Sequence, residues 1–294
     1  MVIDGLSAYI QDPSSGSFDS LALAALQGAG ASSDPVRSWR DVPPLPAAAF
    51  HLAEPAAARA SHPDPDLHRR IIDASFPRFC LPPSGAPLPI LSLIPAEPAS
   101  RLSFWADHLL ARYGSPASAA ACGPRGVETA RARSWAGGRQ REGRPVLVLA
   151  TAATLRRWLE LLERQDLRFR LPAGSAAVEV AGCADPDAPA RSTLLAHLHE
   201  RLGLPAGAVV RAYGKPEQTS LCFTRALAGG DPDLFVAPPW VRVRALDPAT
   251  LAEAPPGTPG RLAVFDLANA GLPLHLLTED VGQVEGARFR LIGS

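Results

Sequence analysis

The sequence contains almost no lysine. Lys215 is the only one among 294 residues, and arginine supplies the other basic side chains. Acidic and basic side chains are equal in number, 29 of each, so the formal net charge is zero. A neutral chain lacks the excess positive charge with which proteins attract polyanions. We therefore expect no nucleic-acid partner.

Long apolar runs and cysteine pairs are also missing. No stretch approaches the ~20 consecutive apolar residues that a membrane-spanning helix needs, and the N-terminus shows no signal-peptide pattern. The cysteines are widely spaced without a Cys-x-x-Cys pair, which argues against a zinc site and against a disulfide framework. We predict a cytoplasmic protein with no membrane partner. Its cysteines are expected to be small buried residues: Cys80, Cys122, Cys183 and Cys222.

Common catalytic patterns are absent as well. No Gly-x-Ser-x-Gly motif occurs, so a serine hydrolase is unsupported. His197 and His199 lie two positions apart on an expected helix, whereas a metal-binding pair on one helical face needs a spacing of four. His62, with Asp64 and Asp66 among prolines, is better explained as a solvated turn than as a cation site.

Alternating strands and helices are what the sequence does contain. Short apolar runs predict buried strands, and apolar residues at helical spacing predict helices. The expected strands span 88–94, 145–150, 176–180 and 208–212, and the expected helices span 18–28, 66–74, 102–113, 151–164 and 191–202. A Pro-rich connector is expected at 42–46. This order implies an α/β fold with a parallel sheet, right-handed crossovers and flanking helices.

The pattern changes after residue 224. Short apolar runs separated by turn signals follow at 240–246, 261–267 and 272–277, which is typical of a meandering or barrel-like β subdomain. We therefore predict three parts. They are an N-terminal helical or irregular segment (1–65), an α/β core (66–224) and a smaller β-rich subdomain (225–294).

Two short motifs lie where strands are expected to end, which is where ligands bind in an open parallel sheet. In the first, YGKPE, the ring of Tyr213 could stack on a purine while Glu217 approaches a phosphate-bound magnesium ion. In the second, Glu279 and Asp280 follow an apolar strand, precede a glycine turn and could accept hydrogen bonds from ribose hydroxyls. On spacing alone, a plain strand exit with a solvated carboxylate explains the first motif better, and a charged turn explains the second better.

Together with the run between them, these motifs resemble the adenylate-forming ligases, and specifically the acyl-protein synthetases of bacterial bioluminescence. The Tyr-Gly-x-Thr-Glu motif of that family is similar to residues 213–217, and Thr219 and Ser220 fit the positions that follow. The segments PWVRVR, LDP, GRL, FDLAN and TEDVG, all between 239 and 282, resemble one continuous block of the family. The resemblance covers most of the chain.

The resemblance implies the large adenylate-binding domain of these ligases, with ATP or AMP and magnesium as cofactors. The activity it implies is AMP-forming activation of a small carboxylic acid to an acyl-adenylate, with transfer of the acyl group to a thiol. It also implies that Glu217 is catalytic and binds the metal. The residues implied for nucleotide binding are Tyr213, Gly214, Thr219 and Asp280.

Several positions depart from the family pattern. Residues 53–61 contain no glycine where the phosphate-binding loop is expected, so that backbone is poorly suited to wrap a phosphate, and Ser84-Gly85 is too short to replace it. Pro216 stands in place of threonine and removes both a hydroxyl and an amide donor. The Gly-Gly segment of the family appears as Ala181-Gly182-Cys183.

The chain also ends at Ser294, where the family continues into a mobile C-terminal domain with a catalytic lysine. We therefore expect that domain to be absent and catalysis by the isolated chain to be impaired. The expected partner is a carrier protein or a separate C-terminal domain. The alternative is a non-catalytic homologue that acts as a binding or scaffold module in a biosynthetic assembly.

Overall fold

The computed structural model describes residues 2–28, 38–46, 64–82, 86–97, 100–181, 191–269 and 272–292. The segment 53–61, Ser84-Gly85, Gly182 and Cys183 lie outside the described residues, so the expectations about them stay predictions.

The chain folds as two compact units, each built from separate stretches of sequence. We call one the β-rich unit, composed of Met1–Ser75, Lys215–Cys222 and Leu234–Ser294. The other, the α/β unit, is composed of Phe76–Gly214 and Phe223–Asp233. The boundaries suggested by the sequence, after 65 and after 224, stay predictions about domains.

The α/β unit is built on a parallel sheet, as predicted. Its strand order is β3-β2-β6-β7-β8, with β9 beside β8. All four pairings along β3-β2-β6-β7-β8 are parallel. The bounds are β2 Ile90–Ser92, β3 Ala119–Ala120, β6 Leu147–Thr151, β7 Ala176–Ala181, β8 Val209–Tyr213 and β9 Cys222–Thr224. A separate antiparallel pair joins β4 (Cys122–Gly123) to β5 (Gly126–Val127).

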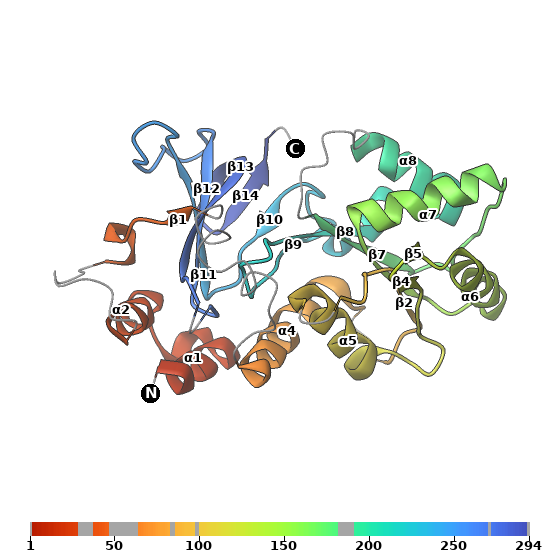
Figure 1. Cartoon of the computed structure of the whole chain (residues 1–294), viewed down its shortest axis with the longest axis horizontal. Coiled ribbons are helices and arrows are strands. Elements are labelled where there is room, and N and C mark those ends of the chain that lie inside the picture. The colour runs from red at the N-terminus through yellow and green to blue at the C-terminus, as the bar shows by residue number, and fades with distance from the viewer. Residues whose placement is uncertain are drawn as a thin grey trace. The chain divides into compact units, whose positions relative to one another are not determined.

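Helices cover both faces of this sheet (Figure 1). Three of them, α6 (Thr129–Glu142), α7 (Ala152–Arg164) and α8 (Arg191–Leu202), join one apolar cluster with alternate residues of the strands. Helix α5 (Arg101–Tyr113) lies on the side opposite α7 and α8. The sequence predicted α5, α7 and α8 but missed α6.

The local sequence of α7 explains where this helix begins and which face it buries. Thr151 accepts from the amide of Thr154, and the Thr154 hydroxyl accepts from the amide of Thr151, which forms a capping box. One face of the helix is apolar and packs into the sheet. Its buried residues are Leu155, Trp158, Leu159 and Leu162.

Helix α4 (Pro65–Cys80) is longer than the predicted 66–74. Asp64 caps it by accepting an amide hydrogen of its first turn. The helix then continues through Pro77, which costs one helical hydrogen bond. Burial of Phe76 beside that proline favours the extra turn.

The β-rich unit is an antiparallel meander, as predicted. Strands β11 to β14 each pair with the next, β10 pairs with β14, and β1 runs parallel to β13. The segment predicted as a Pro-rich connector thus contains a short strand. The bounds are β1 Leu45–Pro46, β10 Phe235–Val236, β11 Val241–Leu246, β12 Gly260–Asp266, β13 His275–Glu285 and β14 Arg288–Leu291.

The length of β13 corrects the prediction for Glu279 and Asp280. The strand was expected to end before them and to turn at Gly282, but it continues to Glu285. Gly282 serves close packing, because a Cβ there would lie 2.6 Å from the carbonyl oxygen of Arg290. Neighbouring residues of a strand point to opposite faces. Glu279 is accordingly exposed while Asp280 is half-buried, so the two carboxylates cannot act as a pair.

The N-terminal part of the β-rich unit adds two helices, α1 (Val2–Gln11) and α2 (Phe18–Gly28). Helix α2 has the predicted bounds, whereas α1 was missed. Phe18 packs edge to face on Trp39 and Phe265, with ring centroids 5.6 and 6.0 Å apart. The apolar spacing that would have revealed α1 is formed by its buried residues Leu6, Tyr9 and Ile10.

Candidate functional site

The segment that follows β8 forms a tight turn within the β-rich unit. The amide of Lys215 donates to Oε1 of Gln218 (2.8 Å), and the amide of Gln218 donates back to the carbonyl oxygen of Lys215 (2.9 Å). Pro216 occupies the second position of this turn, where its fixed φ is favoured. The turn therefore sets the direction in which the Lys215 side chain leaves the backbone.

Two residues anchor the rest of this loop: Asp266, the last residue of β12, and Asn269, which follows shortly after it. Oδ1 of Asn269 accepts from the amide (2.9 Å) and the hydroxyl (2.7 Å) of Thr219. Its Nδ2 donates to the carbonyl oxygen of Glu217 (3.0 Å). Asp266 accepts from the amide and the hydroxyl of Ser220, both at 2.9 Å. These two residues belong to the segment FDLAN, which the sequence marked only as part of a family block.

The anchor is extended by Trp240, whose Nε1 donates to Oγ of Ser220 (2.9 Å). Because that hydroxyl donates its own hydrogen bond to Asp266, the three side chains form a buried, charge-assisted chain of hydrogen bonds. Burial, and then the charge of Asp266, raise the pKa of the nearby Cys222 thiol. Cys222 therefore stays protonated and is unsuited to act as a nucleophile.

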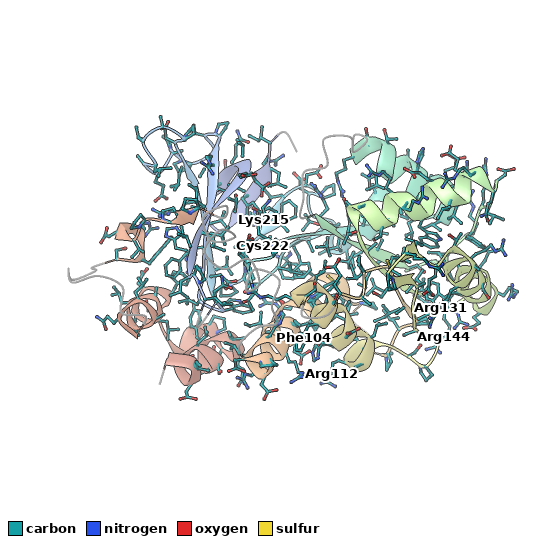
Figure 2. The ribbon with its side chains drawn as sticks, viewed as in Figure 1. Phe104, Arg112, Arg131, Arg144, Lys215 and Cys222 are labelled. Atoms are coloured by element: carbon teal, nitrogen blue, oxygen red, sulfur yellow. The ribbon has the colours of Figure 1, made fainter. Side chains whose placement is uncertain are left out.

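The loop also reaches β13 through an ion pair. Nζ of Lys215, which is labelled in Figure 2, lies 2.7 Å from Oδ2 of Asp280. The two side chains are only 16% and 15% exposed. The amide of Asp280 donates to Oγ1 of Thr278 (3.3 Å), and that hydroxyl donates to the carbonyl oxygen of Leu262 (2.9 Å). Two motifs that are far apart in the sequence are thus joined within one unit.

The predicted site residues fall in both units. Glu217, Thr219 and Asp280 belong to the β-rich unit, where Glu217 is 1% exposed. Tyr213 ends β8 in the α/β unit, and Gly214 follows it. The Tyr213 ring is 2% exposed, so its stacking on a purine stays a prediction.

Metal ligands are sparse in the described parts of the chain, where no group of three or more His, Cys, Asp or Glu residues could hold an ion. Magnesium bound through nucleotide phosphates needs only one or two protein carboxylates, so the assignment of Glu217 as its ligand stays a prediction. His199 is exposed and His197 half-buried on α8. Asp64 is engaged as the cap of α4, in keeping with a turn.

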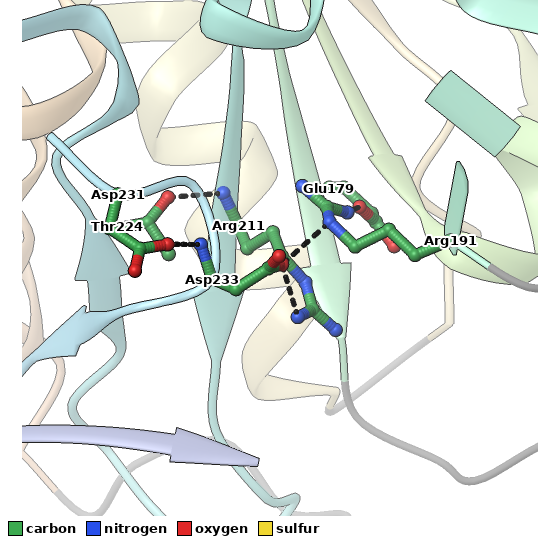
Figure 3. A network of polar contacts seen from close by, with 6 residues as sticks. All are labelled: Glu179, Arg191, Arg211, Thr224, Asp231 and Asp233. Carbon is green, nitrogen blue, oxygen red and sulfur yellow. Dashed lines mark hydrogen bonds and ion pairs between the residues drawn. The ribbon is translucent and has the colours of Figure 1, made fainter. Parts of the chain in front are cut away.

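A second polar cluster lies in the α/β unit (Figure 3). Glu179 and Arg211 are paired across β7 and β8, and Arg191 at the start of α8 donates to Glu179. Asp233 lies 2.8 Å from Nε of Arg191 and 3.2 Å from Nη1 of Arg211. Burial, and then the charge of Arg191, lower the pKa of Arg211, while the two carboxylates oppose this. The two arginines and two carboxylates named here compensate one another, and their contacts fasten α8 to the sheet.

Sequence comparison connects the loop and the anchor to one family. Residues 155–290 match the family model described as acyl-protein synthetase, LuxE. Two curated relatives are long-chain-fatty-acid–luciferin-component ligases. The one from Vibrio harveyi is 45% identical over 47 residues, which is 16% of this chain and 12% of that protein. The one from Aliivibrio fischeri is 41% identical over 51 residues, 17% of this chain and 14% of that protein. The resemblance to acyl-protein synthetases is confirmed for residues 155–290, which are less than half of the chain and not most of it. The matched segments are a small part of the two relatives.

Solved structures share the fold of this chain. ATP-bound MatB from Rhodopseudomonas palustris matches with a TM-score of 0.51 and 17% identity, covering 77% of this chain and 44% of that one. The long-chain-fatty-acid-CoA ligase FadD1 from Archaeoglobus fulgidus matches with a TM-score of 0.52 and 14% identity, covering 76% and 47%. The chain thus spans less than half the length of each. The predicted α/β fold, with a parallel sheet and flanking helices, is confirmed, and these solved structures share it.

Across the described ranges, none of the helices is both long and apolar enough to cross a membrane. The three described cysteines are buried and free, as predicted for them: Cys80, Cys122 and Cys222.

Proposed function

We propose that this chain carries the adenylate-binding domain of an AMP-forming acyl ligase, which activates a carboxylic acid as an acyl-adenylate for transfer to a thiol. One observation carries the proposal. The loop of the Tyr-Gly-x-x-Glu motif is anchored by Asn269 and ion-paired with Asp280, so the two motifs of the family meet in one network. All of these residues fall within the range that matches the acyl-protein synthetase model.

Each residue of this network has a role in the proposal. Asp280 accepts hydrogen bonds from the ribose hydroxyls, and Glu217 holds magnesium together with the nucleotide phosphates. Thr219 is held by Asn269 and keeps the loop in place next to Glu217. ATP, when bound, supplies the adenylyl group that the carboxylic acid receives and the pyrophosphate that leaves.

We expect these 294 residues alone to form an acyl-adenylate slowly. Residues 53–61 lack glycine, and Pro216 supplies neither a hydroxyl nor an amide hydrogen to a phosphate. The catalytic lysine of the family would have to lie outside these residues, because their single lysine belongs to the loop after β8. Removal of one electrostatic contact to the reacting group typically lowers a rate by ~10²–10³.

Two measurements test the proposal. Calorimetric titration with ATP and magnesium should show weak binding. A pyrophosphate-release assay over a panel of fatty and aryl acids should show little or no carboxylate-dependent turnover. Robust turnover that Asp280→Ala abolishes would contradict the impairment and establish a complete ligase. Absence of any nucleotide binding would contradict the adenylate-binding role itself.

A second candidate function is a non-catalytic binding or scaffold module in a biosynthetic assembly. The observation in its favour is that Asp280, the proposed ribose ligand, is already paired with Lys215. Addition of a separately encoded lysine-bearing C-terminal domain, or of a thiol-bearing carrier protein, separates the two candidates. Turnover after that addition supports a split ligase, whereas binding without turnover supports the module.

A further inference from the structure

The loop after β8 offers a nucleotide phosphate almost no backbone donors. The amides of four of its residues already donate hydrogen bonds within the β-rich unit, and Pro216 has no amide hydrogen. Backbone amides are what a phosphate-binding loop normally supplies. The four engaged residues are Lys215, Gln218, Thr219 and Ser220.

Positive charge in this loop is confined to one side chain. From Tyr213 to Ser220 the only cation is Lys215, which is also the only lysine of the chain. Its ammonium group is a compact charge on a flexible four-carbon stem, so it can exchange one oxygen partner for another without movement of the backbone. The turn closed by Gln218 fixes the point from which that stem swings.

The partner of this ammonium group is the carboxylate proposed to hold the ribose. Oδ2 of Asp280 is 2.7 Å from Nζ, at a site of low exposure where an uncompensated carboxylate is costly. Hydroxyl donors from a ribose would stabilise the same carboxylate and so weaken its hold on the ammonium group. A phosphate ester of the same nucleotide carries between one and two negative charges near neutral pH, which makes it a stronger partner.

We propose that Lys215 is the phosphate-binding residue of this nucleotide site. Without nucleotide it neutralises Asp280; with nucleotide, the ribose hydroxyls take the carboxylate and the ammonium group pairs with the phosphate. The ligand class is a nucleoside 5′-phosphate. The inference depends on the proposed function only in taking Asp280 as the ribose ligand.

The test compares AMP with adenosine, which has the ribose but no phosphate. Affinities for both are measured by calorimetry on the full chain, on Lys215→Met, and on Lys215→Arg as the charge-conserving control. We expect the wild type to prefer AMP by about tenfold, Lys215→Met to lose that preference through weaker AMP binding, and Lys215→Arg to keep part of it.

The possible results separate this inference from the proposed function. An AMP preference that is unchanged in Lys215→Met would overturn the phosphate role. Tighter binding of AMP by Lys215→Met would show that the lysine only competes with the ribose, and would overturn it too. Failure of the wild type to bind either ligand would instead refute the proposed function.

A measurement on the wild type keeps the inference testable if Lys215→Met does not fold. Reductive methylation with ¹³C-formaldehyde labels one side chain, Lys215, besides the α-amino group, and leaves its positive charge in place. Adenosine and AMP should both shift the Lys215 methyl signal. Only the AMP complex should show a further shift that titrates near the second pKa of a phosphate ester, about 6. A signal that does not respond to this titration would contradict the inference.

Discussion

Two polar clusters, one in each unit of this protein, are built in different ways. In the β-rich unit, Asp266 and Asn269 accept hydrogen bonds from the main chain and hydroxyls of one loop. In the α/β unit, Glu179, Arg191 and Asp233 join side chain to side chain. The first arrangement fixes the path of a loop, whereas the second fastens one helix to a sheet. Loss of an anchor should therefore leave several donors unsatisfied, while loss of an ion partner leaves one charge that a second substitution can remove.

The largest effect should come from Asp266→Ala, because it strips an acceptor from the Ser220 amide, the Ser220 hydroxyl and the amide of Ala268 in a buried site. We expect the free energy of unfolding, measured with urea, to fall by about 3–5 kcal/mol. Asp247→Ala is the matched control, since Asp247 also accepts two amides and a hydroxyl but is exposed. Similar losses for both variants would show that burial does not distinguish the anchor.

The next effect is a pH dependence within the β-rich unit. Burial, and then the charge of Arg244, lower the pKa of His275 to about 4, although its hydrogen bond to the carbonyl oxygen of Val42 opposes the shift. The unfolded chain, with a pKa near 6.5, takes up the proton first as pH falls. The neutral His275 therefore does not lower the free energy of unfolding above pH ~6.5. As the pH falls toward ~4, this free energy decreases by about 3 kcal/mol.

Urea unfolding of the wild type and of His275→Gln between pH 7 and pH 4 checks this expectation. Glutamine can make a hydrogen bond but does not titrate in that range. The wild type should lose more stability than the variant, because the carboxylates that also titrate in this range are common to both. Parallel pH profiles for the two proteins would contradict a neutral, buried imidazole.

A smaller effect is expected in the α/β unit. Arg191→Met leaves Glu179, whose side chain is 5% exposed, with less compensation, and should lower the free energy of unfolding by about 2 kcal/mol. The double variant with Glu179→Leu should recover most of this loss, since it removes the buried charge. A double-mutant cycle measures the coupling. Additive losses in the free energy of unfolding would mean that Glu179 and Arg191 do not stabilise each other, which would contradict a buried ion pair.

The smallest effect is expected for the surface ion pairs of α7, with which the buried contacts of both units can be compared. Glu160 on α7 lies 3.8 Å from Arg156 and 3.7 Å from Arg157, all on a partly exposed helical surface. Glu160→Gln should change the free energy of unfolding by about 0.3 kcal/mol at low salt, and the difference should vanish in concentrated sodium chloride. A change of more than about 1 kcal/mol would place this surface pair alongside the buried ones.

Much of the α/β unit could be predicted because its elements carry their own signals. The periodic apolar residues of 151–164 and 191–202 gave α7 and α8 to within one residue. Helix α6 was missed because Gly137-Gly138 and several arginines obscure its pattern. Its stability depends on distant contacts, among them the bond from Nε1 of Trp135 to the carbonyl oxygen of Ala117 (2.7 Å).

In the candidate site, the sequence identified Glu217, Thr219 and Asp280 but not what holds them. Asn269 gave no signal of this role, since the loop residues that it holds lie 50 and 52 positions away. The expected turn at Gly282 was wrong for a related reason. A glycine soon after two charged residues is typical of a turn, and only the approach of β14 shows that the missing side chain makes room for another backbone.

The sequence by itself determined the order of strands and helices, the change from an α/β pattern to a meander, and the motifs that resemble one family. These depend on residues a few positions apart, whose spacing and backbone preferences act locally. Only the tertiary structure decided that Lys215 meets Asp280, that Glu279 faces away, and that the segment FDLAN anchors the loop. Those facts follow from strand register and long-range burial, because a shift of one residue would turn each side chain to the opposite face.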